Sequence, residues 1–373
     1  MKGILVSAIF TLGNGLLSIL QLILYSKPRN PKSILIFRTG SIGDSLCAFP
    51  AIYQIRNHFA EAKIDILTAS GDKNLVSIDK MLDPKVFDEI IDYQGLSVRE
   101  WTRIVKSNKY DLIIQLPQSK APLKSLVRDL IFFRLVTKIK SGIGWHWASI
   151  PLFKRYQEKN CRFVNERRRL VEILEKQNIP RSSDRVEIRA NKKDHDKVYS
   201  LLTELNISKE KESIAVVVGA KRLQNRWPIE KFKAVCESLQ QTYNVFLIGG
   251  PEDVDISKPL NELTNVFNFT GKCTPVQSAL LFEQCVLTIS NDTGPMHLSY
   301  FSGTPVVALF SSRDFPNLWY PPNDGINVAL RANDVPCSLC LSETCANNIC
   351  MQSITVVDVL NSVQDVLQNK HKA

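Results

Sequence analysis

The sequence lacks both of the common glycine motifs that bind nucleotide phosphates. The loop 39–45, which follows the first strand-like segment, matches neither G-x-G-x-x-G nor G-x-x-x-x-G-K-[ST]. This argues against a nicotinamide-dependent dehydrogenase and against a P-loop NTPase. No short internal repeat or low-complexity tract is apparent either.

Acidic residues are fewer than basic ones. Asp and Glu number 37 against 47 Lys and Arg, a net charge of +10, and much of the excess lies between Lys120 and Arg169. An acidic partner is therefore expected. No nucleic-acid module and no basic strand interleaved with aromatics is apparent, so an anionic glycolipid or the inner face of a membrane is favoured over nucleic acid. A solvated helical face is the alternative, and it is preferred for the run Arg167–Arg169.

Charge is absent from Gly3 to Ser26, an apolar stretch long enough to span a bilayer. It lacks a small-residue cleavage site, which disfavours a secretory signal peptide. Three cations in residues 27–32, against Lys2 alone on the other side, predict that the body of the protein is cytoplasmic. Asn14 and other polar residues weaken the span, so an interfacial anchor helix is the alternative. Either arrangement predicts association with the inner face of the cell membrane.

A short apolar run, a turn and an amphipathic helix recur along the chain, which predicts an α/β protein with parallel sheets. A length of 373 residues allows two domains. We expect two Rossmann-like, doubly wound domains with the active site between them, at the carboxyl ends of their strands. Strands are expected at 34–38, 64–68, 111–115, 214–218, 245–249, 286–290 and 306–310. Helices are expected near 44–59, 122–136, 229–240 and 276–284. The expected divisions are an apolar anchor 1–32, a first domain 33–177, a linker 178–192, a second domain 193–352 and a C-terminal helix 353–373.

The segment 290–297 is typical of a strand, a tight turn and a helix. Asn291, Asp292, Thr293 and Gly294 favour caps and positive φ, and Pro295 suits the first helical turn. Backbone N–H groups at this turn, together with the Thr293 hydroxyl, would favour an anion such as a diphosphate. The alternative is an ordinary capped turn without a ligand.

The loop after the first strand contains Gly40, Ser41, Gly43 and Asp44. Its glycines let another molecule approach the backbone, and a carboxylate there could act as a general base. The alternative for Asp44 is an acidic residue in the first turn of a helix, favoured by the helix dipole.

Four of the nine cysteines form a cluster with the spacing C-x2-C-x4-C-x4-C. Clustered thiolates in a cytoplasmic chain more often bind a metal than form disulfides. The spacing matches no well-attested zinc ribbon, so free or redox-sensitive thiols are preferred and a metal is the weaker possibility. The cluster consists of Cys337, Cys340, Cys345 and Cys350.

Several of these motifs together resemble one family. The segments that carry the resemblance are Ile36–Asp44, Phe49–Ile52, Arg226–Pro228, Gly249–Glu252, Ser290–His297 and the four-cysteine tail with Cys350–Met351. In this order they resemble glycosyltransferase family 9, the lipopolysaccharide heptosyltransferases, over nearly all of the chain from Ser33. The resemblance implies a GT-B fold and an inverting, metal-independent transfer from ADP-heptose to the inner core of lipid A–Kdo.

The resemblance also implies roles for individual residues. Asp44 would be the general base, on an acceptor-side loop with Gly40, Ser41 and Gly43. Glu252 would lie near the nucleotide ribose. The donor-binding residues would be Asp292, Thr293, Gly294, His297, Glu252 and Arg226.

One position departs from the family pattern. Many members have a lysine before the Arg-Trp-Pro turn, where this chain has Asn225. Arg226, or Lys221 and Arg222, could supply the missing positive charge near the donor phosphates. Because this contact differs from the family pattern, the identity of the donor is left open. The alternatives are transfer of another nucleotide-linked sugar to a lipid-linked or capsular glycan, or a catalytically silent scaffold of the same fold. Asp253-x-Asp255 imitates a metal-binding D-x-D motif but is discounted, because this architecture stabilises the leaving group with dipoles and cations.

Overall fold

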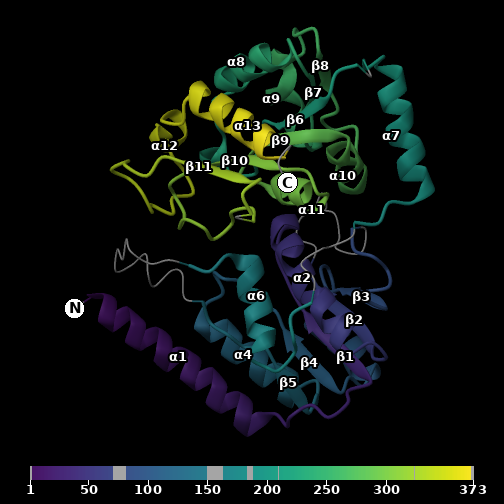
Figure 1. Cartoon of the computed structure of the whole chain (residues 1–373). Coiled ribbons are helices and arrows are strands. Elements are labelled where there is room, and N and C mark those ends of the chain that lie inside the picture. The colour runs from purple at the N-terminus through teal and green to yellow at the C-terminus, as the bar shows by residue number, and fades with distance from the viewer. Residues whose placement is uncertain are drawn as a thin grey trace. The chain divides into compact units, whose positions relative to one another are not determined.

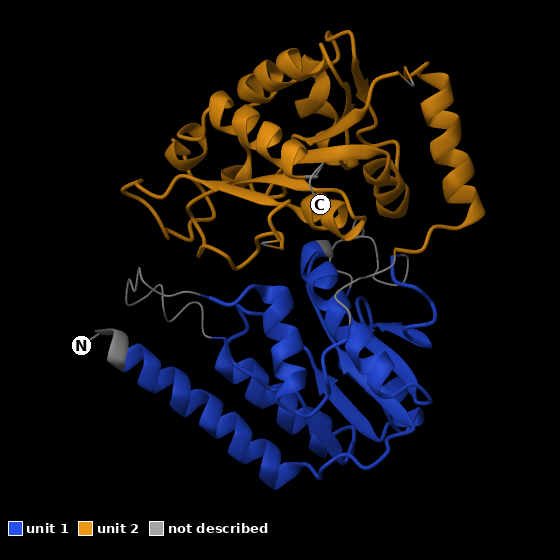
Figure 2. Ribbon diagram, in the orientation of Figure 1, with its two compact units in different colours: residues 1–186 blue, residues 187–373 orange. Residues whose placement is uncertain are grey.

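A computed structural model describes residues 2–69, 81–148, 163–182, 188–208, 210–322 and 324–370. The chain forms two compact units, residues 1–186 and residues 187–373, coloured blue and orange in Figure 2. Each unit has its own parallel sheet and its own apolar core.

Unit 1 begins with a long helix and continues as alternating strands and helices (Figure 1). Its elements are α1 (Lys2–Leu24), β1 (Ser33–Phe37), α2 (Ile42–His58), β2 (Lys63–Thr68), β3 (Glu89–Asp92), α3 (Val98–Ser107), β4 (Leu112–Gln115), α4 (Leu123–Leu135), β5 (Ser141–Ile143) and α6 (Glu166–Glu175).

The five strands of unit 1 have the order β3-β2-β1-β4-β5, and all neighbours are parallel. The strand order reverses between β1 and β4, where Phe37 lies beside Gln115. In open α/β sheets, ligands bind outside the carboxyl ends of the strands at such a reversal. Any ligand site of unit 1 is therefore expected where β1 and β4 end.

Helix α1 packs against α4 and belongs to the core of unit 1. Leu17 is fully buried, and the Asn14 side chain exchanges two hydrogen bonds with the Trp147 backbone, at 3.0 and 2.9 Å. A Cβ at Gly13 would lie 2.5 Å from the Trp147 ring, so glycine allows the close approach. The face of α1 turned away from the unit exposes Leu5, Leu12, Leu16, Ile19, Leu22 and Ile23.

Unit 2 follows the same plan with more strands. Its elements are α7 (Lys192–Glu204), β6 (Ser213–Val217), the 3-10 turn η2 (Leu223–Asn225), α8 (Ile229–Leu239), β7 (Asn244–Leu247), η3 (Pro251–Asp253), α9 (Val254–Ser257), η4 (Lys258–Leu260), β8 (Val266–Asn268), α10 (Pro275–Glu283), β9 (Cys285–Asn291), α11 (Gly294–Phe301), β10 (Val306–Phe310), β11 (Val328–Arg331), α12 (Ile349–Gln352) and α13 (Val356–Lys370).

The sheet of unit 2 has the order β11-β10-β9-β6-β7-β8 and is parallel throughout. Its strand order reverses between β6 and β9. Apolar residues of β6, β7, β9 and β10 pack against α8 and α13, with Trp227 and Phe232 among the buried side chains. The segment 290–297 therefore begins at the strand reversal of this unit, where a ligand is expected.

The predicted fold class is confirmed, and every predicted strand and helix exists within a few residues of its expected bounds. Four strands were not predicted: β3, β5, β8 and β11. Each has only three or four residues and lies at or next to the edge of its sheet. Such short strands show no sustained period in sequence, and pairing with a neighbour decides their conformation.

Candidate active site

The turn between β1 and α2 depends on glycine. Gly40 has φ +145°, and a Cβ there would lie 2.4 Å from the Cβ of Asp44. Ser41 caps α2, and together with Asp44 it forms a capping box. The sequence Gly-Ser-x-x-Asp thus folds the Asp44 side chain back onto the start of its own helix.

The Asp44 carboxylate is half-buried, and one of its two oxygens already accepts hydrogen bonds from Ser41. Its Oδ2 accepts hydrogen bonds from the Ser41 backbone N–H at 2.9 Å and from the Ser41 hydroxyl at 2.7 Å. Its Oδ1 lies 3.8 Å from Nη2 of Arg38, and the side chain is 22% exposed. The capping role that the sequence offered as the alternative is therefore present, and the role as general base stays a prediction.

A buried ion network lies behind Asp44. Arg38 is 1% exposed and lies 3.6 Å from the fully buried Glu166, which also receives two hydrogen bonds from Arg169, at 2.7 and 2.9 Å. The expected solvated face is therefore wrong for Arg169, although Arg168 does form an exposed pair with Glu172. Burying these charges is tolerable because each is paired. The i,i+3 spacing of Glu166 and Arg169 was the available signal.

The same network connects the two strand ends of unit 1. Arg38 donates from Nη1 to the Leu116 carbonyl at 3.2 Å and from Nη2 to the Asp44 carbonyl at 2.7 Å. The Gln118 side chain donates to the Thr39 carbonyl at 2.9 Å. The turn that carries Asp44 is therefore held against the turn that follows β4.

In unit 2, the strand-turn-helix segment lies where it was expected. The Asn291 side chain accepts from the Trp227 backbone N–H at 3.0 Å and donates to the Val218 carbonyl at 2.8 Å, which ties β9 to the end of β6. Thr293 is the N-cap of α11, but its side chain makes no capping hydrogen bond within the described part of the unit. Its hydroxyl is therefore not committed to the helix, unlike that of Ser41.

Asn225 has a defined role at this turn. It is 4% exposed, and its amide donates to Oδ2 of Asp292 at 2.9 Å and to the Asp292 carbonyl at 3.3 Å. The Ser311 hydroxyl in turn donates to Oδ1 of Asn225 at 2.8 Å. An uncharged side chain thus orients Asp292 where the family pattern has a lysine. The sequence identified Asn225 as a departure but did not predict these contacts.

His297 lies on the inner side of α11. It is 3% exposed, its Nδ1 is 3.1 Å from the Tyr300 hydroxyl, and its ring packs edge-on against Tyr300 and Trp319. These contacts are those of a packed histidine. A contact with the donor stays a prediction.

The turn after β7 carries two acids with different surroundings. Glu252 is exposed and folds over Gly250, where a Cβ would lie 2.4 Å from its Oε2. Asp253 is 5% exposed, accepts from the Gly250 backbone N–H at 3.1 Å, and its pKa is raised by burial. The Arg226 charge opposes that rise, while Nε of Arg226 donates to the Ala220 carbonyl at 2.8 Å. The sequence did not single out Asp253 as a buried acid.

Neither the discounted D-x-D segment nor the four-cysteine cluster is arranged as a metal site in the described residues. Asp255 pairs with Lys258 at 2.7 Å while Asp253 turns inward, so the D-x-D acids do not converge. No group of three or more His, Cys, Asp or Glu in the described ranges is placed to hold a metal ion. The metal possibility at the cysteine cluster is therefore not supported. Cys337, Cys340, Cys345 and Cys350 are free thiols.

Two units, each with a doubly wound parallel sheet, have the architecture of the GT-B fold, which solved glycosyltransferase structures share. The family model of glycosyltransferase family 9 (heptosyltransferase) matches residues 98–350, and the chain belongs to this family.

Individual relatives are distant but cover most of the chain. It is 23% identical over 341 residues to lipooligosaccharide heptosyltransferase 2 of Campylobacter jejuni, which covers 88% of this chain and 97% of that protein. A glycosyltransferase family 9 structure from Veillonella parvula matches with a TM-score of 0.72 at 18% identity, covering 92% of this chain and all of the other. The E. coli ADP-heptose lipopolysaccharide heptosyltransferase II matches with a TM-score of 0.64 at 17% identity, covering 91% and 99%. At these identities the structural matches establish the fold alone.

Proposed function

We propose that this glycosyltransferase moves a heptose from an ADP-sugar to a lipopolysaccharide inner-core acceptor, with inversion at the anomeric carbon. Membership of the heptosyltransferase family supports heptose as the transferred sugar. The similar fold of an enzyme named for ADP-heptose supports an ADP-sugar as the donor. The observation that carries the proposal is the start of α11, where the Thr293 hydroxyl makes no capping bond at the strand reversal of unit 2. A helix N-terminus with uncommitted donors favours a diphosphate.

The chemistry assigns Asp44 to the acceptor. The acceptor hydroxyl loses its proton to the carboxylate as its oxygen bonds to the anomeric carbon, while the bond from that carbon to the diphosphate oxygen breaks. Oδ1 is the atom for this task, because Oδ2 already accepts two bonds from Ser41. The negative charge that develops on the departing ADP is stabilised by the N-terminus of α11 and the Thr293 hydroxyl.

We also propose that the enzyme works at the inner membrane surface, where such an acceptor would lie, and that α1 makes the contact with the membrane. The stretch Leu5–Leu24 is long and apolar enough to cross a membrane. A spanning helix would have to abandon the Asn14 bonds to Trp147 and the burial of Leu17. We therefore favour a helix that lies in the membrane interface with Leu12, Leu22 and the other exposed side chains in the lipid.

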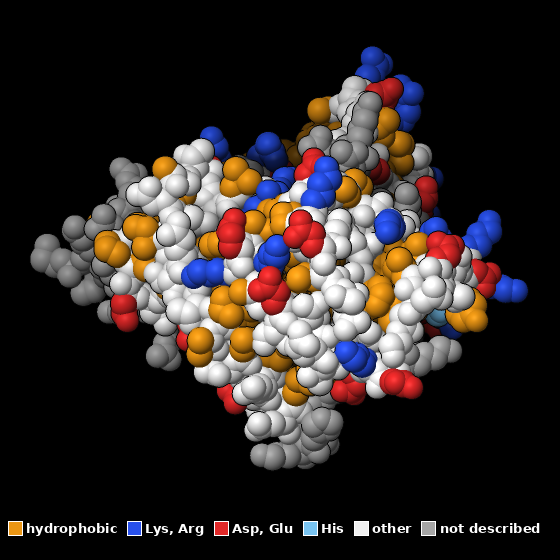
Figure 3. All heavy atoms as spheres, turned by 90° about the horizontal axis from the view of Figure 1, so that it is seen from above, with side chains coloured by type: hydrophobic (Ala, Val, Ile, Leu, Met, Phe, Trp, Pro, Cys, Tyr) orange, Lys and Arg blue, Asp and Glu red, His pale blue; other side chains and the backbone are white. Residues whose placement is uncertain are grey.

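Charge on the molecule supports this placement. Basic residues of the stretch 120–140 lie on and around α4, the helix that packs against α1. Arg134 donates to the Leu24 carbonyl at 2.5 Å, at the end of α1. On the face shown in Figure 3, by contrast, side chains of both signs are interspersed with apolar ones. Lysine and arginine beside an apolar helix face favour an anionic lipid surface.

The test is calorimetric titration of the full-length protein in mild detergent with ADP, UDP and GDP, in the presence of a chelator. The full chain is required because α1 is part of the unit 1 core. Selective ADP binding that weakens in Thr293→Val supports the ADP-sugar donor, and incorporation of heptose into lipopolysaccharide core would complete the case. Val keeps the shape and β-branching of Thr and replaces its hydroxyl by a methyl group.

Two other results would redirect the assignment. Preference for UDP or GDP would leave the assignment as a glycosyltransferase intact. The proposed product would then be another lipid-linked or capsular glycan. Absence of binding to all three nucleotides would make a catalytically silent scaffold the better description.

A further inference from the structure

Glu166, at the start of α6, is a fully buried carboxylate without a role in the proposed transfer. A buried charge is costly unless an opposite charge compensates it. Arg169, one helical turn later, donates to both of its oxygens, at 2.7 and 2.9 Å. A second cation, Arg38, lies 3.6 Å from Oε1 of Glu166 and is itself buried. Glu166 therefore has more positive charge around it than one ion pair requires.

Arg38 lies close to two carboxylates at once. Its Nη2 is 3.6 Å from Oε1 of Glu166 and 3.8 Å from Oδ1 of Asp44. Both separations are longer than a hydrogen bond. The short bonds of Arg38 go instead to main-chain carbonyls, to that of Asp44 at 2.7 Å and to that of Leu116 at 3.2 Å. The two carboxylates thus share one guanidinium, and neither side chain is hydrogen-bonded to it.

The distance between Arg38 and Asp44 matters if Asp44 is a general base. A guanidinium that donates directly to a carboxylate oxygen occupies a lone pair and stabilises the ionised form. Such an oxygen takes up a proton less readily. Arg38 could make this bond, because its Nε has no hydrogen-bond partner among the described residues. A second carboxylate beside the same guanidinium opposes the bond, and its negative charge also favours protonation of the first.

The fold holds Glu166 in this competing position. Arg169 donates to it through Nε and Nη2, and Nη2 of Arg169 also donates to the Pro117 carbonyl. Helix α6, which Glu166 begins, packs against α2, the helix that carries Asp44. A side chain anchored by two hydrogen bonds to a neighbour on its own helix keeps its place when an adjacent group changes charge.

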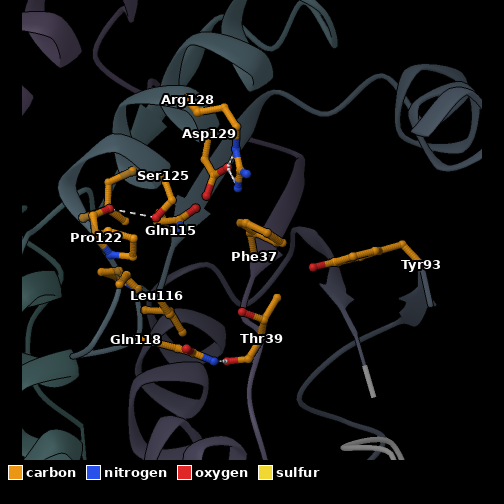
Figure 4. Close-up of a pocket in the computed structure, with 13 residues that line it drawn as sticks. Phe37, Thr39, Tyr93, Gln115, Leu116, Gln118, Pro122, Ser125, Arg128 and Asp129 are labelled. Carbon is orange, nitrogen blue, oxygen red and sulfur yellow. Dashed lines mark hydrogen bonds and ion pairs between the residues drawn. The ribbon is translucent and has the colours of Figure 1, made fainter. Parts of the chain in front are cut away.

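The turns that carry these groups are also joined to each other. Arg38 directly follows β1 and bonds the Leu116 carbonyl, which follows β4. The Gln118 amide donates to the Thr39 carbonyl at 2.9 Å, a bond that Figure 4 shows beside Leu116. The distances from Arg38 to the two carboxylates are therefore set by the packing of unit 1.

Two other titratable groups of unit 1 lie near this set, and both stay neutral between pH 5 and 8. Burial raises the pKa of the Cys47 thiol, on α2 one turn after Asp44. The charges of the neighbouring side chains act on Cys47 in both directions: those of Glu166 and Asp44 add to the rise, and those of Arg38 and Arg167 oppose it. Burial and the charge of Arg169 lower the pKa of His146 to about 4. The charges that act on Asp44 in this range are thus those of the carboxylates and arginines.

We propose that Glu166 is a positioning residue for the transfer reaction. It competes with Asp44 for Arg38, and so leaves Oδ1 of Asp44 free to take the proton of the acceptor hydroxyl. The proposal rests on the proposed function, because it requires Asp44 to be the general base. Arg169 acts one step further away, by holding Glu166 in place.

The first test follows the ionisation of Asp44 and needs no substrate. Full-length protein in mild detergent, labelled with carbon-13 at the aspartate side-chain carboxyls, is titrated by NMR, and the Asp44 signal is the one that Asp44→Asn removes. Glu166→Gln is expected to move the midpoint of this signal to lower pH by about one unit, because Arg38 can then bond Oδ1. Arg38→Gln is expected to move it to higher pH, because the cation is lost and Glu166 remains.

The second test measures transfer as a function of pH. In Glu166→Gln, kcat on its plateau is expected to fall about tenfold, and its acid limb should move in the same direction as the NMR midpoint. The Kd of ADP should not change. Glu166→Asp keeps the charge and should keep the wild-type midpoint. Glu172→Gln, which removes the partner of the exposed Arg168 on the same helix, is the control and should alter neither readout.

Opposite shifts in Glu166→Gln and Arg38→Gln would support the inference. A purely structural Glu166 would lower the melting temperature and the rate but leave the midpoint and the acid limb unchanged, and this result would overturn it. Shifts in the same direction in both variants would overturn it too. If Glu166→Gln does not fold, Arg38→Gln decides, and a midpoint that does not rise in that variant sinks the inference.

This inference and the proposed function can fail separately. If ADP-heptose is the donor, Asp44→Asn abolishes transfer and neither variant shifts the midpoint, the function stands and the inference falls. If both shifts are seen but another nucleotide sugar is the donor, the assignment of ADP-heptose falls and the inference stands. Transfer by Asp44→Asn at the wild-type rate would remove Asp44 as the base and overturn the inference, as would a complete absence of transfer.

Discussion

Asp44 serves two roles that one substitution can separate. Asp44→Asn keeps an oxygen to accept the Ser41 backbone N–H, so α2 should still be capped. Loss of the basic carboxylate is expected to lower kcat by about 10²- to 10⁴-fold, the usual contribution of a general base. The ADP dissociation constant should not change, because the donor contacts are proposed for unit 2. Steady-state kinetics and calorimetry on the same preparation measure both.

Ser41→Ala is the comparison for that experiment. It removes the cap of α2 and should lower the free energy of unfolding by about 1 kcal/mol, while the Asp44 carboxylate remains. A loss of transfer as large as that of Asp44→Asn would mean that the geometry of the turn, and not the basicity of Asp44, limits the rate.

Asn225 allows a test of how Asp292 is oriented. Asn225→Asp would place a second carboxylate where the amide now lies 2.9 Å from Oδ2 of Asp292. Two carboxylates so close cannot both ionise easily, so the pKa of the pair rises. ADP affinity is expected to fall at least tenfold at pH 8 and to recover partly at pH 5, where the pair shares a proton. Titrations at the two pH values check this.

Asn225→Ala provides the uncharged counterpart. It removes the hydrogen bonds to Asp292 and adds no charge, so any loss of ADP affinity should be the same at pH 8 and pH 5. A similar recovery at pH 5 in both variants would locate the titrating group elsewhere.

At the scale of elements, α1 carries a prediction about the membrane. Leu12, Leu22 and Ile23 are each more than 70% exposed, and inserting such a side chain in lipid contributes on the order of 1.5–3 kcal/mol. Changing all three to Gln is expected to release the protein from anionic vesicles in flotation assays without lowering its melting temperature. A triple variant that still resists alkaline extraction would indicate a spanning helix.

Leu17→Ala is the matched change on the buried face of the same helix. It should destabilise unit 1 by about 2–5 kcal/mol, because it opens a cavity against α4. Vesicle binding of the folded protein should be unaffected, since Leu17 does not face the lipid.

The docking of α1 also makes stability depend on pH. His146 packs edge-on against Phe10 of α1, and burial, with the charges of Arg169 and Lys176, lowers its pKa to about 4. A lowered histidine pKa means that the folded state resists protonation, so stability is present above the unfolded pKa near 6.5 and is lost as the pH falls toward 4. His146→Phe should lose less stability than wild type between pH 6.5 and 4. Chemical denaturation across that range measures the difference.

The strands that could be predicted from the sequence differ from those that could not in how much their conformation depends on local residue pattern. The strands around Ile36, Val216 and Ile289 are continuous apolar runs, and their turns contain Gly, Ser and Asp, so pattern alone located them. Strand β5 contains Gly142 and is only three residues long, and it becomes a strand by pairing with β4.

The same distinction applies to the candidate site. The two turns with Asp44 and Thr293 could be located because Gly, Ser, Thr and Asp after an apolar run indicate a turn locally, although residues 291–294 have no positive φ and the Thr293 side chain makes no capping bond. The buried position of Arg169 depends on contacts between residues far apart in sequence, such as that of Glu166 with Arg38. No period or motif along the chain encodes such contacts.

At the scale of the whole molecule, the two units have separate cores, and we propose that one activates the acceptor and the other binds the donor. The proposed general base, Asp44, belongs to unit 1, while the proposed donor-binding residues around Thr293 belong to unit 2. Each unit has a parallel sheet of its own and buries its own apolar cluster. Each unit is thus expected to unfold as a cooperative body, and a ligand that contacts one unit should stabilise that unit first.

Calorimetric unfolding should therefore show two transitions, of which ADP raises only one. At a free ADP concentration of 100 Kd, that transition should gain about 2.7 kcal/mol in free energy of unfolding. Thr293→Val should cancel most of this gain, and Asp44→Asn should not, because the donor cradle lies in residues 187–373. A single transition that ADP shifts as a whole would mean that the units are energetically coupled. ADP binding to unit 2 would then also stabilise unit 1, including the turn that carries Asp44.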